Sequence, residues 1–437
     1  MNLAETIRAK TARWPYALTA VISALAAFGT YSSMYAFRKA FAAGTYSGQS
    51  YLHVDYKVWL VIFQVVGYTL SKFYGIRFIA ALNGKRRGAT ILMLVGISWL
   101  ALLGFALVPA PYNMIFLFVN GFPLGLIWGL VFGYLEGRRS TEFMAAVLSI
   151  SLIFGSGFVK TVGQTLLHTY QVNEYMMPFL TGALFVFPIL FFVILLELMP
   201  APTEKDKLMR TERKPMTALE RKQFISRFLP GIILTLVIYV LLTVMRDVRD
   251  NFEVEIWNSL GITDKNIYAK IDSRISIVVL IAMSSLFLIK RNLKAFGIIH
   301  LLIVGGCILI GASTLLFSLH HIGPVAWMTM AGLGLYLGYV PYNAIFFERM
   351  IATFQYKSNV GFVMYIADAL GYLASVSVLL IKEFGKPNIS WGNFFKDGVV
   401  LVAVIGSICG TLSFIYFFLS ARKISIRKKT PLKFSTI

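Results

Sequence analysis

The chain alternates long apolar stretches with short polar connections, and this alternation favours a membrane environment. Of its 437 residues, 57% are hydrophobic and only 14% are charged, too few charges for the surface of a soluble protein of this length. A bilayer core about 30 Å thick is crossed by a helix of about 20 apolar residues. Twelve stretches meet that length, so the sequence predicts an all-α membrane protein with twelve transmembrane helices. The predicted spans are 14–37, 57–81, 89–109, 112–135, 143–167, 175–198, 228–246, 272–289, 294–318, 324–347, 358–381 and 397–420.

The positions of lysine and arginine predict the orientation of these spans. Cations gather at the N-terminus, in GKRRG at 84–88, in the 199–227 segment, in KRNLK at 290–294 and in the C-terminal tail. With twelve crossings all of these lie on one side, and cytoplasmic loops are the ones rich in Lys and Arg. We therefore expect a multi-pass protein with both termini cytoplasmic. The compact layout without long loops favours a bacterial inner membrane.

The longest polar segment predicts the domain organisation. It divides the chain into an N-terminal six-helix bundle at 1–198, a basic cytoplasmic linker at 199–227, and a C-terminal six-helix bundle with a cytoplasmic tail at 228–437. The net charge of +21 follows from this topology and the cytoplasmic cations, so it does not call for a nucleic-acid partner. The linker is expected to lie on the inner leaflet, or to bind a partner protein.

The two predicted bundles repeat each other in sequence. YSSMYAFR at 31–38 aligns with YVLLTVMR at 239–246, and GLIWG at 125–129 aligns with GLYLG at 334–338 at nearly the same offset. Parallel six-helix repeats are typical of major facilitator transporters, in which the substrate binds between the halves. The predicted fold is therefore two pseudo-symmetric six-helix bundles of the major facilitator type.

The repeat brings together two polar helix faces, because residues spaced i, i+4 and i+7 lie on one side of a helix. The faces are Tyr31, Tyr35 and Arg38 in the first span, and Tyr239, Thr243 and Arg246 in the seventh. Burying an arginine in a span costs at least about 2.5–3.5 kcal/mol, so we expect both arginines to bind substrate in a cavity. Two alternatives stay open. In the first, Arg38 lies at the outer interface. In the second, a nearby aspartate neutralises Arg246 or Arg249.

Two motifs carry a resemblance to a known family. YAFRKAF at 35–41 and GYTLSKFYG at 67–75 resemble the organophosphate:phosphate antiporter family of the major facilitator superfamily. The family has an Arg-Lys pair followed by Phe late in its first helix and Ser-Lys-Phe in its second. The resemblance implies that Arg38 is the first phosphate-binding arginine, that Lys72 lines the same cavity and that Arg246, by the repeat, is the second. It implies exchange of a phosphate ester for phosphate.

The chain departs from the family in two places. The loop after the second span reads ALNGKRRG, with Asn83 where aspartate is common, and the fifth span has Lys160 instead of a cavity histidine. Lys160 either adds positive potential to the cavity or pairs with a carboxylate such as Asp368 in the eleventh span. Lys72 either lines the cavity or extends to the inner face, and Lys39 is expected at the outer rim.

Aromatic residues and the acid content complete the predicted site. Tyr336 and Tyr339 are expected to line the pocket, with structural packing as the alternative. Asp368 is the one carboxylate that the predicted spans place well inside the membrane, and this favours exchange of one anion for another over proton coupling. If Asp368 titrates instead, the chain is a proton-coupled carrier of a sugar, an amino sugar or a peptide fragment. A transporter-like membrane sensor is a third hypothesis.

The sequence does not favour an enzyme. It contains no nucleophile–base pair, no phosphate-binding glycine loop and no cluster of metal ligands, so we expect no catalytic residue, no cofactor and no metal. The expected partners are a small anionic substrate and the lipid bilayer, with no nucleic acid, and the chain is expected to be a monomer.

Overall fold

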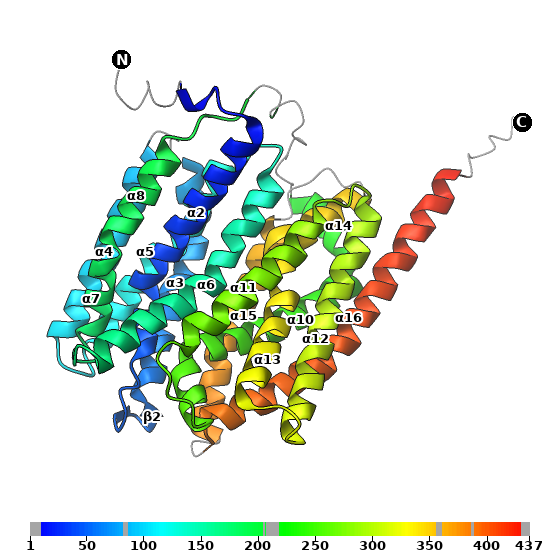
Figure 1. Cartoon of the computed structure of the whole chain (residues 1–437). Coiled ribbons are helices and arrows are strands. Elements are labelled where there is room, and N and C mark those ends of the chain that lie inside the picture. The colour runs from blue at the N-terminus through cyan, green and yellow to red at the C-terminus, as the bar shows by residue number, and fades with distance from the viewer. Residues whose placement is uncertain are drawn as a thin grey trace, which may run out of the picture. The chain divides into compact units, whose positions relative to one another are not determined.

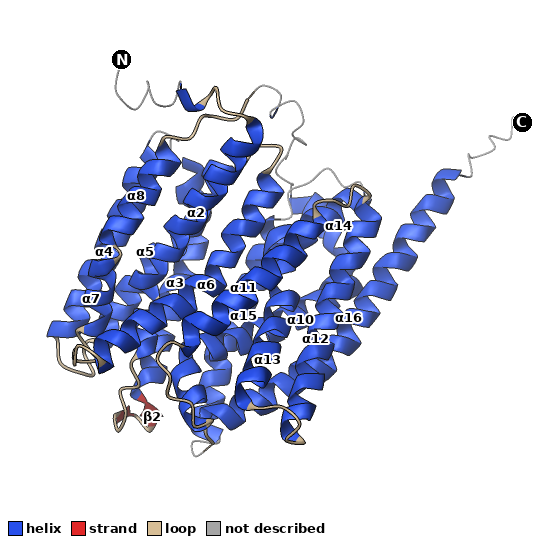
Figure 2. Cartoon of the chain, viewed as in Figure 1, coloured by secondary structure: helices blue, strands red, loops and turns tan. Residues whose placement is uncertain are grey.

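The structure is a computed structural model of the chain that describes residues 10–81, 86–203, 206, 218–354, 361–385 and 389–429. Almost every described residue lies in a helix, as Figure 2 shows. The strands among them are β1 (Ser50–Tyr51) and β2 (Val54–Asp55), which pair antiparallel in a short hairpin before α3. The predicted all-α fold class is confirmed.

The helices follow the predicted spans in order along the chain (Figure 1). Those of the first half are α2 (Tyr16–Arg38), η1 (Ala40–Ala43), α3 (Tyr56–Ala81), α4 (Arg87–Leu107), α5 (Met114–Leu135), α6 (Thr141–His168), α7 (Met177–Leu184) and α8 (Val186–Glu197). Those of the second half are α10 (Ala218–Ser259), α11 (Ile267–Leu286), α12 (Asn292–Ser318), α13 (Pro324–Pro341), η3 (Tyr342–Phe346), α14 (Phe347–Phe354), α15 (Gly361–Gly385) and α16 (Trp391–Lys429).

Within the described residues, seven helices are long and apolar enough to cross a membrane. The pair α7 and α8, bent by 43°, makes an eighth if it is one span. The chain is therefore a multi-pass integral membrane protein. The count of twelve crossings, the cytoplasmic termini and the bacterial inner membrane stay predictions.

Helix α10 differs most from its prediction. The seventh span was expected at 228–246, but the helix runs from Ala218 to Ser259, with non-helical backbone only at Phe252 (φ −117°, ψ 22°). The predicted end was wrong because charged residues were taken as a boundary, whereas here they are buried and paired. Part of the predicted linker, 204–205 and 207–217, lies outside the described residues, and the domain division at 199–227 stays a prediction.

The chain forms two compact units, each described by itself. Unit 1 contains α2 to α8, the second part of α10, α11 and the second part of α15; its segments are Met1–Thr211, Val244–Ser284 and Ala369–Asp397. Unit 2 contains the first part of α10, α12 to α14, the first part of α15 and most of α16; its segments are Glu212–Thr243, Ser285–Asp368 and Gly398–Ile437.

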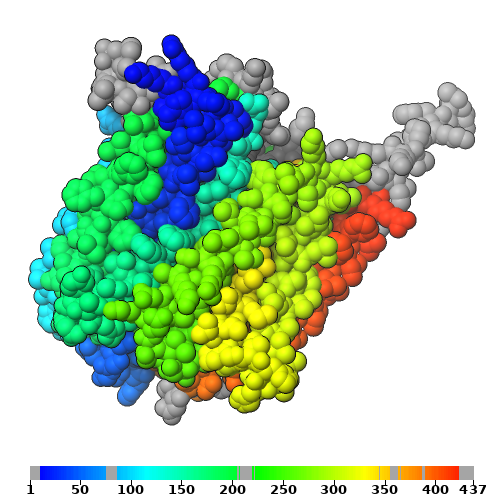
Figure 3. All heavy atoms as spheres, in the orientation of Figure 1, coloured from blue at the N-terminus to red at the C-terminus, as the bar shows by residue number. Residues whose placement is uncertain are grey.

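In unit 1 the helices pack closely through small residues. On the face shown in Figure 3, side chains of α2 and α6 lie against each other, and a Cβ added at Gly155 of α6 would lie only 3.2 Å from the Ser32 Cα of α2. Gly67 of α3 likewise lies against the Phe118 carbonyl oxygen of α5, and Gly121 of α5 lies against the Gln64 carbonyl oxygen of α3. Small residues let membrane helices approach closely, and such contacts fix α2, α3, α5 and α6 around one core.

Replacing Gly121 with alanine is expected to destabilise unit 1 by about 1–3 kcal/mol, the usual cost of overpacking a core. The new methyl group would lie closer to the Gln64 carbonyl oxygen of α3 than van der Waals contact allows, and a backbone atom cannot rotate away. The control is Gly96→Ala in α4, where no atom lies within 4 Å of the added methyl group. Thermal unfolding in detergent should show a lower Tm for the first variant alone. Equal Tm values would contradict the close approach of α3 and α5.

Unit 2 uses the same device on other helices. A Cβ added at Gly306 of α12 would lie 2.6 Å from the Gly334 carbonyl oxygen of α13, and one at Gly334 would lie 2.5 Å from the Gly306 carbonyl oxygen. The buried His300 on α12 contacts the Phe296 carbonyl oxygen at 2.9 Å and the Ser413 Oγ of α16 at 3.3 Å. These contacts hold α12, α13 and α16 together.

Candidate functional site

Arg38 is the last residue of α2, and its side chain is buried among aromatic rings in unit 1. It is 7% exposed. Its guanidinium carbon lies 3.9 Å from the centroid of the Tyr68 ring of α3 and 5.8 Å from that of Tyr35. Among the described residues no carboxylate pairs with this guanidinium, and Nε has no hydrogen-bond partner. The Arg38 side chain therefore lies inside the protein and not on its surface.

Hydrogen bonds to the backbone hold the end of α2 in place. The Gln64 Nε2 of α3 donates to the Arg38 carbonyl oxygen at 2.6 Å, and the Asn120 Nδ2 of α5 donates to the Phe37 carbonyl oxygen at 2.8 Å. Gln64 also donates to the Asn120 side chain at 2.8 Å. The last carbonyls of a helix have no partner within it, so these two amides satisfy them and position the Arg38 side chain.

Tyrosines surround the Arg38 guanidinium. Those within electrostatic range of it are Tyr31, Tyr35, Tyr68 and Tyr372. The Tyr31 ring lies 5.8 Å from Tyr35 and 5.0 Å from Trp128 of α5, and Tyr68 packs edge-on against Tyr372 at 5.5 Å. The Lys72 Nζ lies 4.9 Å from the centroid of the Tyr68 ring. The structure thus brings the predicted residues Tyr31, Tyr35 and Lys72 together around Arg38.

Arg246 lies in the same unit but has a carboxylate partner. Its Nη2 lies 2.5 Å from the Asp247 Oδ1, and the other Asp247 oxygen accepts a hydrogen bond from the Ser375 Oγ of α15 at 2.9 Å. The Tyr35 hydroxyl lies within electrostatic range of both Arg38 and Arg246. The two predicted arginines therefore share Tyr35 as a neighbour, and the structure supports the alternative in which an aspartate neutralises Arg246.

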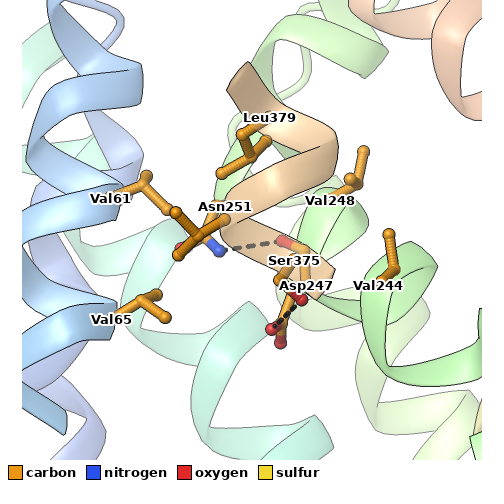
Figure 4. Close-up of a pocket in the computed structure, with 9 residues that line it drawn as sticks. Val61, Val65, Val244, Asp247, Val248, Asn251, Ser375 and Leu379 are labelled. Carbon is orange, nitrogen blue, oxygen red and sulfur yellow. Dashed lines mark hydrogen bonds between the residues drawn. The ribbon is translucent and has the colours of Figure 1, made fainter. Parts of the chain in front are cut away.

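A narrow pocket lies beside the Arg246–Asp247 pair (Figure 4). Its walls are mainly valine side chains of α3 and α10. Its polar groups belong to Asp247, Asn251 and Ser375, which bond to one another; the Asn251 Nδ2 donates to the Asp247 carbonyl oxygen at 2.8 Å. Because these groups satisfy each other, the pocket presents a mainly apolar lining.

Lys160 of α6 is buried against acids of α10. Its Nζ lies 2.8 Å from the Glu253 Oε2 and 3.2 Å from the Asp250 Oδ1. Lys160 was predicted to line the substrate cavity, and the structure supports the alternative in which it pairs with a carboxylate, with Glu253 and Asp250 as partners instead of Asp368. The reason is the greater length of α10, which carries two acids beyond its predicted end and places them beside α6.

Two further cations complete this group of buried charges. Lys39, expected at the outer rim, is instead 3% exposed, with its Nζ 2.8 Å from the Asp250 Oδ2 and 2.7 Å from the Asn251 Oδ1. The Arg249 Nη2 lies 2.7 Å from the Asp272 Oδ1 of α11 and 3.2 Å from the Glu253 Oε1. We name this group the charge cluster; its members are Lys39, Lys160, Arg249, Asp250, Glu253 and Asp272.

The charge cluster removes the argument by which the sequence favoured anion exchange over proton coupling. The sequence placed only Asp368 well inside a span, but Asp250, Glu253 and Asp272 are buried in α10 and α11. Sequence reasoning did not expect these buried acids because the predicted seventh span ends at Arg246 and the predicted eighth begins at Asp272. A shortage of buried carboxylates therefore no longer favours anion exchange over proton coupling.

The other predicted site residues lie in unit 2. The Tyr239 hydroxyl of α10 donates to the Asp368 Oδ1 of α15, and its ring lies 5.5 Å from that of Tyr339 on α13. Tyr336 and Tyr339 are buried, whereas Asp368 is half-buried. The structure thus joins Tyr239, Tyr339 and Asp368 in one polar contact. Their substrate-binding role stays a prediction.

Sequence reasoning missed three participants, Tyr68, Glu253 and Asp272. Tyr68 stands four residues before Lys72, so the helical spacing already places the two side chains on one face. Arg246, Arg249, Asp250 and Glu253 repeat at intervals of three and four residues, the period of a helix face, and this period was the signal that α10 continues. Nothing local in the sequence marks Asp272, whose partner lies on another helix. Within the described residues, no group of three or more His, Cys, Asp or Glu side chains is arranged to hold a metal ion.

Comparison of the sequence with models of known families assigns the chain to a family. Residues 40–420 match the model of a family described as a family of unknown function, DUF5690. The chain belongs to this family. No curated protein matches the sequence of this DUF5690 member.

Solved structures show the fold of this DUF5690 member. A D-xylose-proton symporter is 14% identical, with a TM-score of 0.59, covering 92% of this chain and 97% of the other. The xylose transporter XylE from E. coli, in an inward open conformation, is 12% identical, with a TM-score of 0.58 and coverage of 91% and 95%. The peptide transporter POT in complex with alafosfalin is 13% identical, with a TM-score of 0.59 and coverage of 97% and 99%. The fold is that of the major facilitator transporters.

Proposed function

We propose that this protein is a secondary active transporter that carries a small organic anion across the membrane by alternating access, and that it is not an enzyme. The observation that carries the proposal is Arg38, a buried arginine within a group of tyrosines and without a carboxylate partner among the described residues. A guanidinium donates two parallel hydrogen bonds to a carboxylate or phosphate group. An ionisable side chain inside a membrane bundle is costly, and binding of an anionic substrate offsets that cost.

The contrast with the neighbouring cations supports this role. The other buried cations of unit 1 described here each contact an acid: Lys39 with Asp250, Lys57 with Glu255 at 2.5 Å, Lys160 with Glu253, Arg249 with Asp272, and Lys382 with Glu383 at 2.8 Å. Their positive charges are balanced within the protein. The positive charge of Arg38 is left for a ligand.

Within this proposal the substrate is a phosphate ester that exchanges for phosphate. Lys72 and Arg38 both lie against the Tyr68 ring, and two cations close together suit an anion with two negative charges. The motifs at 35–41 and 67–75, which contain Arg38 and Lys72, are also those that resemble the antiporter family. The protein acts as a monomer with the bilayer as its surroundings, both termini in the cytoplasm, and in a bacterial inner membrane.

A second candidate function is proton-coupled transport of a sugar, an amino sugar or a peptide fragment. The charge cluster favours it, because three buried carboxylates are available for a proton. Proteins of similar fold include, by their titles, a D-xylose-proton symporter and a peptide transporter. In this case Arg38 would bind a carboxylate of the cargo or a partial negative charge on it.

The test is ligand-dependent thermal stability of the purified protein, because a ligand that binds only the folded state raises the apparent Tm. The panel contains inorganic phosphate, glycerol phosphate, hexose phosphates, simple carboxylates, neutral sugars and dipeptides. We expect a phosphate ester to raise the Tm of the native protein and to have no effect on Arg38→Ala.

The control is Arg274→Ala in α11, which removes an exposed arginine and should keep the full ligand response. A shift with phosphate esters that persists in Arg38→Ala would refute the role of Arg38. A shift with neutral sugars alone would refute the anion proposal and support the second candidate.

A further inference from the structure

Asp272 of α11 is the member of the charge cluster whose carboxylate is least satisfied. The residue is 0% exposed. Its Oδ1 accepts a hydrogen bond from the Arg249 Nη2 at 2.7 Å, whereas its Oδ2 is buried and has no hydrogen-bond partner among the described residues. An ionised carboxylate that is buried with one oxygen lacking a donor pays a large desolvation penalty.

The charges that face Asp272 do not remove this penalty. From α10 it faces the cation Arg249 and the anion Glu253, and from α6 it faces Lys160. The Lys160 ammonium makes its hydrogen bonds to Ser156, Asp250 and Glu253, not to Asp272. The negative charge of Glu253 opposes ionisation of Asp272, and Arg249 divides its Nη2 between the two acids. A proton on Oδ2 would turn the unpartnered acceptor into a donor and relieve the repulsion.

The packing of α6 keeps other donors away from Oδ2. Gly157 of α6 lies beside it, and an added Cβ at Gly157 would lie 2.6 Å from the Asp272 Cβ and 2.7 Å from the Oδ2. A glycine is therefore required for this approach, and no side chain at 157 reaches the carboxylate. The Asp272 carboxyl group therefore lies against the backbone of α6 at Gly157.

Arg249 connects the charge of Asp272 to the position of helices. Its Nη2 lies between Asp272 of α11 and Glu253 of its own helix, at 2.7 and 3.2 Å. With Asp272 ionised, Arg249 holds α11 against α10. With Asp272 protonated, the attraction between the two weakens, and Arg249 keeps its ion pair with Glu253. Protonation thus changes the strength of a contact between two helices.

We propose that Asp272 is a proton-binding site that couples the proton gradient to transport. A proton from one side of the membrane binds to Oδ2 and forms the neutral acid, and it is released to the other side after the helices move. No electron is transferred, and Arg249 keeps its charge throughout. This inference rests on the proposed function only in taking the protein to be a transporter. It holds for an anion as for a neutral cargo.

The first experiment measures the proton itself and needs no substrate. Infrared difference spectra of the purified protein are recorded during a pH titration, in which a protonated carboxylic acid shows a C=O stretching band that the ionised form lacks. We expect a titrating band that is lost in Asp272→Asn and is kept in Asp397→Asn, the matched change of an exposed acid in α16. A band that survives in Asp272→Asn, or that disappears in Asp368→Asn instead, would overturn the proposal.

The second experiment measures transport in proteoliposomes with the compound that gives the largest Tm shift. Asp272→Asn should lose accumulation driven by a pH gradient while it keeps counterflow, the exchange of labelled for unlabelled compound at equal pH. Gradient-driven accumulation at the native level in this variant would overturn the proposal. Absence of counterflow in the native protein would refute the transporter function instead, and the infrared band would still decide the protonation of Asp272. The Tm values of Asp272→Asn and of the conservative variant Asp272→Glu show whether these proteins still fold. A variant with a native Tm and no gradient-driven accumulation has lost coupling, not folding.

Discussion

Replacing Lys160 with methionine is expected to destabilise the protein by about 3–5 kcal/mol, the usual cost of removing one partner from a buried ion pair. Lys160 is fully buried, and its loss leaves the Glu253 Oε2 without its ammonium donor and Asp250 with one cation fewer. Methionine has a similar length and no charge, so the apolar packing is largely kept. The expected result is a large fall in Tm and in the yield of folded protein after purification.

The partner variants show whether the charge is the cause. Lys160→Met combined with Glu253→Gln should be less destabilised than the sum of the two single variants, because removal of the acid also removes the unpaired charge. Lys270→Met of α11, an exposed lysine, should leave the Tm unchanged. Additive effects in the double variant would show that Lys160 and Glu253 do not interact.

Replacing Arg38 with methionine is expected to have the opposite effect and to raise the Tm in the absence of ligand. Arg38 is also buried, but its positive charge has no carboxylate partner in the described part of the chain. Removing this charge therefore also removes the free-energy cost of burying it. The cation–π contact with Tyr68 returns about 2 kcal/mol, against a cost of about 2.5–3.5 kcal/mol or more for the buried charge. The same variant should lose binding and flux of the anion.

The measurement pairs thermal unfolding with uptake into proteoliposomes. Higher stability together with lost transport is the expected signature of a residue kept for function. Arg38→Lys keeps the charge but not the planar pair of donors, so it should remain less stable than Arg38→Met and bind the anion weakly. A fall in the Tm of Arg38→Met as large as that of Lys160→Met would show that Arg38 has a structural partner.

Much of the architecture could be predicted because it depends on local composition. The length of each apolar stretch reflects the thickness of the bilayer, so every predicted span overlaps a helix or a set of consecutive helices. The i, i+4, i+7 spacing of Tyr31, Tyr35 and Arg38 likewise placed these residues on one face before any contact was known. The end of α10 was missed because charged residues normally mark the edge of a span, and a buried stretch such as RDVRDNFEVE breaks that rule.

The pairing of charges could not be predicted, since it depends on which helices meet. Arg38 and Lys39 are adjacent in the sequence, yet a tyrosine ring lies beside one and Asp250 of α10 pairs with the other. The sequence by itself determined the class of protein, the number and order of its apolar stretches and the cations that lie within them. Only the tertiary structure decided which of those cations are neutralised, because long-range packing brings α10 and α11 to α2 and α6. That packing left the Arg38 Nε and the Asp272 Oδ2 without a hydrogen-bond partner among the described residues.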